Sequence, residues 1–244
     1  MKGMVLAAGL GTRLRPLTDS RPKALVEVAG RTLLEITLTR LKSFGICEVI
    51  VNAHHFAEMI AEFLKAKDNF GMRIEISREE ALLDTGGGLK KAAWFFREEQ
   101  EPLLLHNVDV ISTVDFDLMV NAHKASGALA TLAVQERESS RYLLFDEKAG
   151  LCGRRIVREK KDDIVRRVEG VKVLAFTGIH VISPRMLTMM KEDGVFSIID
   201  SYLRLVGEGQ KIRCFRADEY YWRDLGKLEQ VDRAEEDYKT GFFS

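Results

Sequence analysis

Apolar and polar residues alternate along the first half of the chain in blocks of two kinds. Short apolar runs, such as residues 4–8, which Gly9 ends, are typical of strands buried on both faces of a parallel sheet. Longer segments lie between them, and in these the apolar residues return every three or four positions, as Leu34, Leu38 and Leu41 do. That spacing is typical of helices that bury one face. The alternation therefore predicts βαβ units around a parallel sheet.

The predicted elements change in character at about residue 136. Before this point, strands are expected at residues 4–8, 48–53, 72–77, 102–106 and 128–134, and helices at 32–44, 56–65, 88–96 and 115–125. After it, shorter strands are expected at 142–146, 154–158 and 171–182, and helices at 184–191, 197–206 and 227–238. The sequence has no Pro- or Ser-rich linker and no repeat. We therefore predict a single α/β domain over 1–244, with a Rossmann-like, mixed and mostly parallel sheet. A nucleotide-binding half at about 1–136 is followed by a smaller half at about 137–244 that covers the substrate.

Composition and charge exclude several classes of protein. With 46% hydrophobic and 30% charged residues, the chain is neither disordered nor collagenous, and no run is long enough to span a membrane. Basic and acidic residues both number 37, which argues against nonspecific nucleic-acid binding, so an anionic ligand must be met by local charge. The start faintly resembles a signal peptide, but its apolar run is short and Arg13 follows at once. The three cysteines form no C-x-x-C, so we expect reduced thiols in a cytoplasmic protein, with no membrane or nucleic-acid partner.

The strongest chemical signal is a glycine-rich loop directly after the first strand. Residues 6–18 read L-A-A-G-L-G-T-R-L-R-P-L-T, and R-P-K-A-L follows at 21–25. Gly9 and Gly11 let the backbone curl, and successive N–H groups in such a loop form a nest for phosphate oxygens. Arg13 and Lys23 add the positive charge that a triphosphate and a leaving pyrophosphate require. The spacing is not that of a P-loop, and Leu14 stands where a dinucleotide fingerprint needs a third glycine.

In these residues the chain resembles the sugar-1-phosphate nucleotidyltransferases, also called nucleotide-sugar pyrophosphorylases. The shared signature is L-A-A-G-x-G-T-R-L-x-P-L-T with P-K-x-L after it. The likeness continues at D-T-G-G-G (84–88), the base-contacting turn, and at N-V-D (107–109), where the family has N-G-D. It also includes F-T-G-I (176–179) on the sugar-side strand and W-R-D-L-G (222–226). The resemblance thus covers roughly residues 2–238.

The resemblance implies a nucleotide-diphospho-sugar transferase fold in which 137–244 is the sugar-binding half. It implies transfer of a nucleoside monophosphate from an NTP to a sugar 1-phosphate, with Arg13 stabilising the pyrophosphate and Lys23 the transferring phosphate. The nucleotide would contact Leu6, Ala7, Ala8, Gly9, Gly11, Thr12, Asn52, Thr85, Gly86, Gly87 and Asn107. The sugar would contact Thr177, Gly178 and Asp200, and Mg²⁺ would bind Asp109 and Asp224.

Asp109 and Asp224 can also be interpreted from their places in the sequence, without the family resemblance. Asp109 follows the buried strand at 102–106, and open α/β sheets bind ligands at the carboxyl ends of their strands. Mg²⁺ takes carboxylate and phosphate oxygens. Taken alone, Asp109 is equally a turn residue and Asp224 equally a helix N-cap; the family match pairs them. Val108 replaces the usual glycine, and we expect its Cβ to crowd this turn.

Substrate and class stay open between alternatives. The short length, the T-G-G-G turn and the missing C-terminal β-helix look most like N-acetylmuramate-1-phosphate uridylyltransferases of cell-wall precursor synthesis. Similar short chains use GTP with mannose- or heptose-type sugar phosphates. A non-catalytic NDP-sugar sensor is a further alternative, although the four signature charges are all present.

A basic segment and several histidines give weaker signals. Residues 154–167 hold seven basic residues against three acidic ones, either a solvated hairpin or a mobile arm that holds the sugar phosphate or a lactyl carboxylate. The adjacent His54 and His55 are poor co-ligands, and we expect His106 and His180 to be packing residues. No nucleophilic triad has motif support, which argues against covalent catalysis. The oligomeric state is left open.

Overall fold

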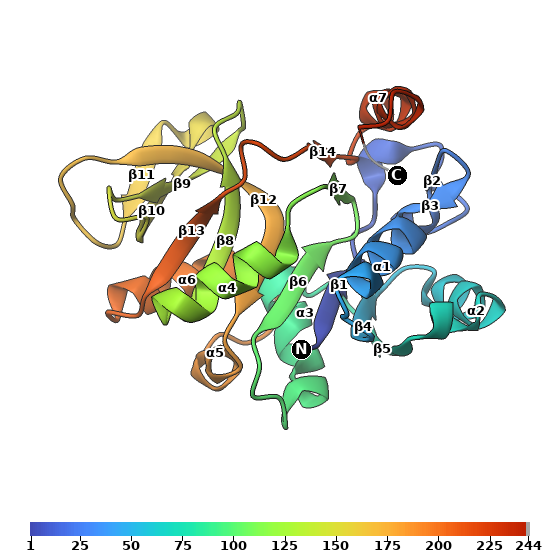
Figure 1. The fold of residues 1–244 in the computed structure, drawn as a ribbon, viewed down its shortest axis with the longest axis horizontal. Helices are drawn as coiled ribbons and strands as arrows, with labels where there is room; N and C mark the ends of the chain where they lie inside the picture. Colours follow the sequence, from blue (N-terminus) through green and yellow to red (C-terminus); the bar gives the residue numbers. More distant parts are fainter. Residues whose placement is uncertain (243–244) are drawn as a thin grey trace.

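The computed structural model describes residues 1–242, and its centre is one twisted sheet (Figure 1). Four neighbouring strands of this sheet are parallel: β5 (Arg73–Arg78), β4 (Glu48–Ala53), β1 (Gly3–Leu6) and β6 (Leu103–Asn107). Beyond β6 the sheet continues with β12 (Lys172–Ile182), β8 (Ala130–Gln135) and β13 (Ile212–Arg216). Because β12 is antiparallel to both β6 and β8, the sheet is mixed, as predicted.

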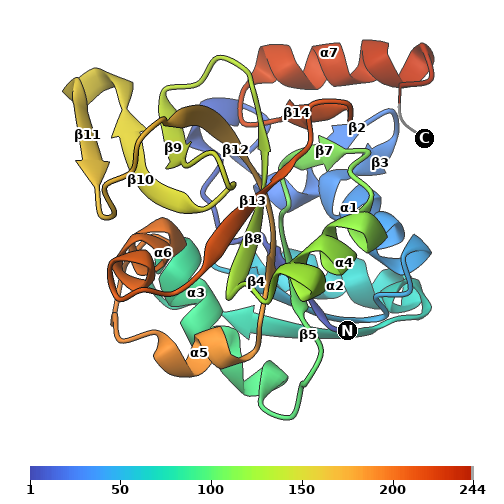
Figure 2. The same cartoon turned by 60° about the vertical axis from the view of Figure 1, so that its left-hand side comes forward.

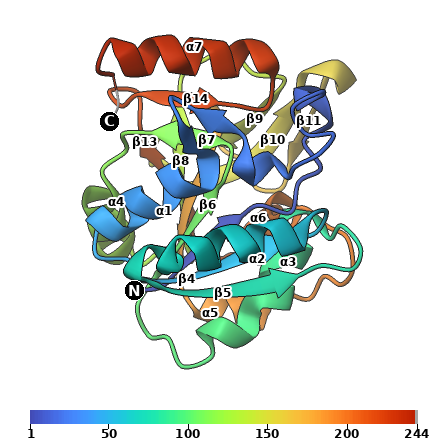
Figure 3. The same cartoon turned by 90° about the vertical axis from the view of Figure 1, so that its right-hand side faces the viewer.

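The helices cover the two faces of the sheet, as Figure 3 shows. One core contains side chains of α1 (Leu33–Ser43), α2 (Ala57–Ala66), α4 (Phe116–Ser126) and α7 (Leu228–Lys239). The other contains side chains of α3 (Asp84–Ala92), α5 (Arg185–Met189) and α6 (Ile198–Gly207). On β1, Val5 belongs to the first core, and Met4 and Leu6 belong to the second. Burial on both faces explains why this strand is a continuous apolar run.

The second half adds a small antiparallel extension beside the main sheet. Strands β9 (Arg141–Phe145), β10 (Leu151–Ile156) and β11 (Lys161–Ile164) pair in sequence, and β9 joins the first residues of β12 (Figures 1 and 2). The long strand β12 therefore belongs to both parts of the sheet. The division near residue 136 stays a prediction, and it falls directly after β8.

The structure contains elements that the sequence pattern does not predict. The short strands among them are β2 (Glu27–Val28), β3 (Arg31–Thr32), β7 (Val110–Ser112), β11, β13 and β14 (Trp222–Asp224). The 3₁₀ turns are η1 (Thr12–Leu14), η2 (Lys23–Leu25), η3 (Asp68–Gly71), η4 (Ala93–Phe96) and η5 (Val157–Glu159). The helix expected at 88–96 begins earlier and ends as the 3₁₀ turn η4. Among residues 1–242, no helix has both the length and the hydropathy to cross a bilayer.

Candidate active site

Two neighbouring cavities open at the carboxyl end of the parallel strands. One has a volume of about 660 Å³ and the other of about 440 Å³, and both are lined by Asn107 and Asp109, at the end of β6 and just after it. This is the edge at which open α/β sheets bind ligands. We call the larger one the sugar-side cavity, because Thr177 and Gly178 line it, and the smaller one the nucleotide-side cavity, because Ala8 and Gly9 line it.

The glycine-rich loop is folded so that it presents Lys23 to the centre of the site. Gly11 has φ +64°, and a Cβ there would lie 2.9 Å from Thr18 Cγ2 and 3.1 Å from Lys23 Cβ, so only glycine fits. The Thr18 hydroxyl donates to the Gly11 carbonyl at 2.9 Å and closes the loop. Lys23 is buried, and its ammonium forms an ion pair with the Asp109 carboxylate. The loop thus holds a cation directly against the predicted metal ligand.

Asp109 and Asp224 are brought together by a strand pair that sequence patterning missed. β7 and β14 pair antiparallel with Asp224 opposite Val110, and the Leu225 N–H donates to the Asp109 carbonyl at 2.8 Å. Both aspartates line the sugar-side cavity, as does Arg13. A Cβ on Gly226 would lie 2.8 Å from both Asp224 Oδ1 and Arg13 Nη2. Arg13, Lys23, Asp109 and Asp224, from three distant parts of the chain, therefore converge.

This carboxylate pair fits a magnesium ion that is completed by substrate. Mg²⁺ usually keeps several waters and is held by one or two carboxylates plus substrate phosphates. Among the described residues, no group of three or more His, Cys, Asp or Glu side chains is placed to hold a metal by itself. The donors present are two hard oxygen ligands beside a cavity large enough for phosphates. Asp109 and Asp224 are thus suited to Mg²⁺ bound together with a nucleotide.

Val108 does not disturb the turn between β6 and Asp109. Its side chain is buried in the core that contains α1 and α4, and its N–H donates to the Leu6 carbonyl at 3.1 Å. Its φ is outside the positive range in which glycine would be needed. The expected crowding by the Val108 Cβ is therefore wrong, because the side chain points into a packed core and the backbone is ordinary.

The nucleotide-side cavity gathers about half of the predicted nucleotide contacts. Its lining includes six of them: Leu6, Ala8, Gly9, Asn52, Thr85 and Asn107. The other five, Ala7, Gly11, Thr12, Gly86 and Gly87, are not part of this lining. Leu82 and Val195 also line it, and with 37% and 68% of their surface exposed they are unusual apolar residues. They make this wall of the cavity apolar, which is usual for a small-molecule pocket.

A buried carboxylate that sequence reasoning missed supports this cavity. Glu79, directly after β5, accepts hydrogen bonds from Asn52 Nδ2 at 2.6 Å and from the Leu83 N–H at 3.0 Å. Asn52 Oδ1 in turn accepts from the Ala7 N–H at 2.7 Å. This network fixes the Asn52 amide and occupies the Ala7 N–H. No motif in the sequence marks Glu79. Its position shortly before the glycine turn is the one signal that could have pointed to a supporting role in this cavity.

The three glycines of the T-G-G-G motif allow close packing on α3. A Cβ on Gly86 would lie 2.3 Å from the Phe196 ring, and one on Gly87 would lie 2.3 Å from the Gly194 carbonyl oxygen. A Cβ on Gly88 would lie 2.7 Å from both Asn52 Nδ2 and Glu79 Oε1. The N–H groups of Gly86 and Gly87 donate to the Phe196 carbonyl. The base-reading role of Gly86 and Gly87 stays a prediction, whereas Thr85 faces the cavity.

The F-T-G-I segment forms a bulge in β12 that shapes the sugar-side cavity. The pairing of β12 with β8 shifts register between Phe176 and His180, and Gly178 has φ +81°. A Cβ on Gly178 would lie 2.7 Å from Asn107 Nδ2, so glycine lets Asn107 approach. The Thr177 hydroxyl is directed inward, where it donates to the Ala133 carbonyl. Asp200 is outside the cavity lining and pairs with Arg154 at 2.5 Å.

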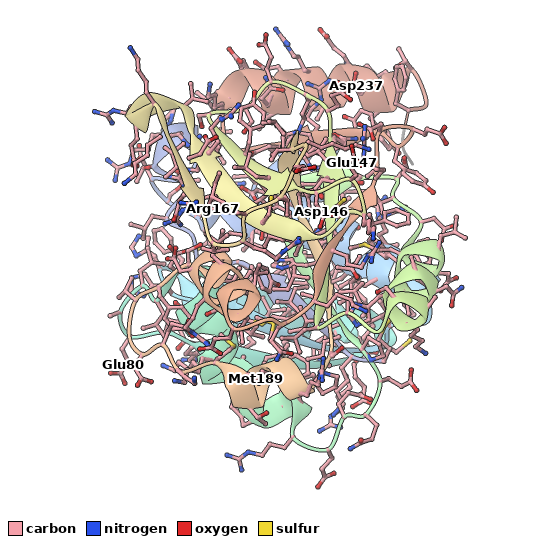
Figure 4. The ribbon with its side chains drawn as sticks, turned by 90° about the vertical axis from the view of Figure 1, so that its left-hand side faces the viewer. Glu80, Asp146, Glu147, Arg167, Met189 and Asp237 are labelled. Carbon is pink, nitrogen blue, oxygen red and sulfur yellow. The ribbon has the colours of Figure 1, made fainter. Side chains whose placement is uncertain are left out.

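The basic segment 154–167 is a hairpin that is largely held by its own ion pairs. Arg155 makes two hydrogen bonds to Asp162, which hold the pKa of this carboxyl below its ordinary value. Arg166 pairs with Asp146 at 2.7 Å; Figure 4 labels Asp146 and Arg167 on this face of the molecule. Arg154 and Arg155 still line the sugar-side cavity. The segment is thus a hairpin with exposed basic residues, and two of its arginines reach the cavity; its role as a mobile arm stays a prediction.

Two further arginines line the same cavity from the segment between β8 and β10. Arg141 begins β9, is exposed, and has no acidic side chain within ion-pair distance among residues 1–242. Arg137 lies over the Trp222 ring at 3.7 Å and donates to the Phe176 carbonyl at 2.9 Å. Burial lowers the pKa of Arg137 and nearby Asp224 opposes the shift, but a guanidinium stays protonated. Neither residue carried a motif in the sequence.

The buried histidines have no place in this chemistry. Burial lowers the pKa of His106 to about 4 and that of His180 to about 3, so both are neutral near pH 7. His180 Nδ1 is 2.7 Å from the Tyr202 hydroxyl, and neither histidine lines the two cavities. This burial agrees with the packing role expected for them.

Comparison with known proteins supports the geometry. The model of the family described as nucleotidyl transferase matches residues 2–241. The chain is 36% identical to the N-acetylmuramate alpha-1-phosphate uridylyltransferase of Caulobacter vibrioides, over 91% of this chain and 90% of that protein. It is 29% identical to the mannose-1-phosphate guanyltransferase of Candida albicans, over 93% of this chain and 61% of that protein.

A solved structure confirms the predicted fold class. The crystal structure of HddC from Yersinia pseudotuberculosis complexed with GMP-PN superposes with a TM-score of 0.76 at 20% identity, covering 97% of this chain and 99% of that one. The family match spans almost the whole sequence, and the resemblance expected from the glycine loop is confirmed. The chain belongs to the nucleotidyl transferase family and is an enzyme of the sugar-1-phosphate nucleotidyltransferase class.

Proposed function

We propose that this enzyme transfers UMP from UTP to N-acetylmuramate 1-phosphate, releasing the UDP-sugar and pyrophosphate. The observation that carries the substrate is the arginine wall of the sugar-side cavity, formed by Arg141, Arg154 and Arg155. A sugar phosphate has one anionic group, and N-acetylmuramate adds a lactyl carboxylate. Arginine recognises carboxylates through paired hydrogen bonds, and Arg141 is free of any internal acid in the described part of the chain. The relative from Caulobacter supports the same assignment.

The reaction requires positioning and charge rather than a covalent intermediate. A phosphate oxygen of the sugar 1-phosphate attacks the α-phosphorus of UTP, and the bond to the pyrophosphate oxygen breaks in line with the attack. Lys23, which lines the nucleotide-side cavity and pairs with Asp109, neutralises the transferring phosphate, and Arg13, which lines the sugar-side cavity, stabilises the charge that grows on the pyrophosphate. When bound by Asp109 and Asp224, Mg²⁺ supplies charge neutralisation to the phosphates.

The nucleotide-side residues determine how UTP is held. The base fits beside Leu82 and Val195, and Asn52, fixed by Glu79, holds that side of the cavity in shape. Thr85 adds a polar contact at the start of α3. The three cysteines are free thiols, which is compatible with the reducing cytoplasm, where we place the reaction.

A guanylyl transfer to mannose or heptose 1-phosphate is the second candidate. The Candida relative is named for such a reaction, and the superposed Yersinia structure holds a guanine nucleotide analogue by its title. The ion pair of Lys23 with Asp109 and the approach of Arg13 to Asp224 agree with an enzyme rather than with the sensor considered from the sequence, because a sensor has no need for this set of charges.

The deciding experiment is a substrate matrix combined with one matched pair of variants. For the wild type, we expect kcat/KM to be higher for UTP with N-acetylmuramate 1-phosphate than for GTP with mannose 1-phosphate. In Arg141→Gln, kcat/KM for N-acetylmuramate 1-phosphate falls about 10-fold, since a charge-assisted hydrogen bond contributes about 1.5 kcal/mol or more. For N-acetylglucosamine 1-phosphate, which has no carboxylate, it changes less than about two-fold.

The control variant is Arg158→Gln, which changes an exposed arginine of the neighbouring hairpin at 154–167 that does not line the cavity. Its kinetic constants stay close to the wild-type values for both sugars. A higher kcat/KM for GTP with mannose 1-phosphate rejects the uridylyl assignment. Equal losses for the acidic and the neutral sugar in Arg141→Gln reject the role of Arg141 in reading a carboxylate.

A further inference from the structure

A third cavity adjoins the reaction centre on the far side of the Arg137–Trp222 stack. Its volume is about 430 Å³, and Arg13, Arg137, Trp222 and Asp224 line both it and the sugar-side cavity. Its other walls come from the start of α7, with Lys227, and from the segment that follows β8. We call this space the side chamber. The proposed binding of nucleotide and sugar phosphate makes no use of it.

The side chamber has an excess of unpaired positive charge. Among the described residues, no carboxylate lies within ion-pair distance of Arg13, Arg137 or Lys227, whereas Arg223 on the same wall is paired with Asp237 at 2.5 Å. The opposing acids are Glu138 and Asp224, and Asp224 is the proposed metal ligand. The three cations thus face a hollow rather than internal partners.

Two further observations indicate an anion. The Arg137 Nε is buried without a hydrogen-bond partner in the described structure, although the guanidinium stays charged. The α7 helix begins at the chamber, and its N-cap, Lys227, provides no side-chain hydrogen bond to the first turn. Open N–H groups at a helix start favour negative charge, and here they add to the cations.

We propose that the side chamber receives the inorganic pyrophosphate product, an inference that rests on the proposed function. Arg13 and Arg137 line both cavities, so pyrophosphate that leaves the α-phosphorus beside Arg13 passes into a chamber whose lining also includes Lys227. No bond forms or breaks in this step, and only the anion moves. Lys227 then affects pyrophosphate release and the affinity for pyrophosphate in the reverse reaction, but not the affinity for the sugar phosphate.

The test compares Lys227→Gln with Lys239→Gln, which changes an exposed lysine at the other end of the same helix. Forward kcat measured with added inorganic pyrophosphatase stays within about two-fold of the wild type in Lys239→Gln. In Lys227→Gln the inhibition constant for inorganic pyrophosphate, and its KM in the reverse reaction, both rise about five-fold, as expected for one partly exposed charge. Lys227→Arg restores both values.

The outcomes separate this proposal from the proposed function. Calorimetric titration with inorganic pyrophosphate and Mg²⁺, without nucleotide, measures pyrophosphate binding in the side chamber. It does so even if the enzyme turns over no sugar phosphate. Weaker binding only in Lys227→Gln supports the chamber, whatever the substrate matrix shows. Turnover with unchanged pyrophosphate inhibition and binding in Lys227→Gln, relative to Lys239→Gln, overturns the chamber and leaves the proposed function intact.

Discussion

Replacement of Glu79 by glutamine tests whether the buried network supports the nucleotide-side cavity. Glu79 has only 4% of its surface exposed, and each carboxylate oxygen accepts one hydrogen bond, from Asn52 Nδ2 and from the Leu83 N–H. Asn52 continues the network to the Ala7 N–H at the end of β1. Glutamine has nearly the same shape, so the change removes an acceptor without opening a cavity.

The magnitude follows from counting acceptors. After Glu79→Gln the side chain has a single acceptor oxygen, so its NH₂ group must face either the Asn52 amide donor or the Leu83 N–H, and one buried donor loses its partner. A lost charge-assisted bond and an unpaired buried donor cost about 2–4 kcal/mol in the free energy of unfolding. For a chain of this length, this corresponds to a fall in Tm of roughly 5–15 °C.

The assay is thermal unfolding followed by circular dichroism, with Glu80→Gln as the control because Glu80 is the exposed neighbour in sequence (Figure 4). The control changes Tm by about 1 °C or less. With UTP as substrate, Glu79→Gln raises KM more than it lowers kcat, because Asn52 loses its fixed orientation. Equal Tm values for Glu79→Gln and Glu80→Gln would refute the reasoning.

Three further predictions concern the catalytic charges and the buried histidines. Asp109→Asn and Asp224→Asn each remove most of the turnover while the circular dichroism spectrum is kept; rates close to wild type at saturating Mg²⁺ contradict the metal assignment. Arg13→Ala lowers kcat by on the order of 10²-fold with a smaller change in KM, whereas a rise in KM alone makes Arg13 a ground-state binder. His106 and His123 have pKa values of about 4 and His180 of about 3 in the folded protein, against about 6.5 when unfolded, so the unfolded chain binds more protons below pH 6.5. The free energy of unfolding in urea therefore falls as the pH drops from 6.5 toward 4, approaching about 1.4 kcal/mol per pH unit for each histidine, and a flat profile over this range excludes the shift.

Local patterns were sufficient to predict most of the longer strands and helices of the first half. The strand expected at 48–53 is β4, and the helix expected at 115–125 is α4, displaced by one residue. These elements are buried on one or two faces along their whole length, so the period of their apolar residues reports the structure directly. The place of β8 in the strand order of the sheet could not be predicted from this periodicity. β12, eleven residues long, lies between β6 and β8, and that pairing joins residues at least forty positions apart.

That distant segments of the chain meet in one site could be predicted only from the family resemblance. β7 and β14 have three residues each, and their stability comes from pairing with one another across more than a hundred residues of chain. Nothing local in either segment marks a strand. Glu79, Arg137 and Arg141 were missed for a related reason. A single polar residue forms no periodic pattern in the sequence. Its role can be inferred only from the residues that surround it in the fold.

A chain with no net charge binds anions here because the fold pairs its charges unevenly. Basic and acidic residues are equal in number, and the hairpin at 154–167 neutralises much of its own positive charge through Asp146, Asp162, Asp163 and Asp200. The cations without an acidic partner in the described structure include Arg13, Arg137, Arg141 and Lys227, and all four line the sugar-side cavity or the side chamber. Lys23 differs from these four cations, because its ammonium is paired with the Asp109 carboxylate. We expect a bound phosphate to share the positive charge of Lys23 with Asp109. Other cations, such as the exposed Arg21 and Lys65, also have no acidic partner in the described structure, so a position at a cavity together with the missing partner makes a basic residue available to this ligand, a combination that composition alone does not contain.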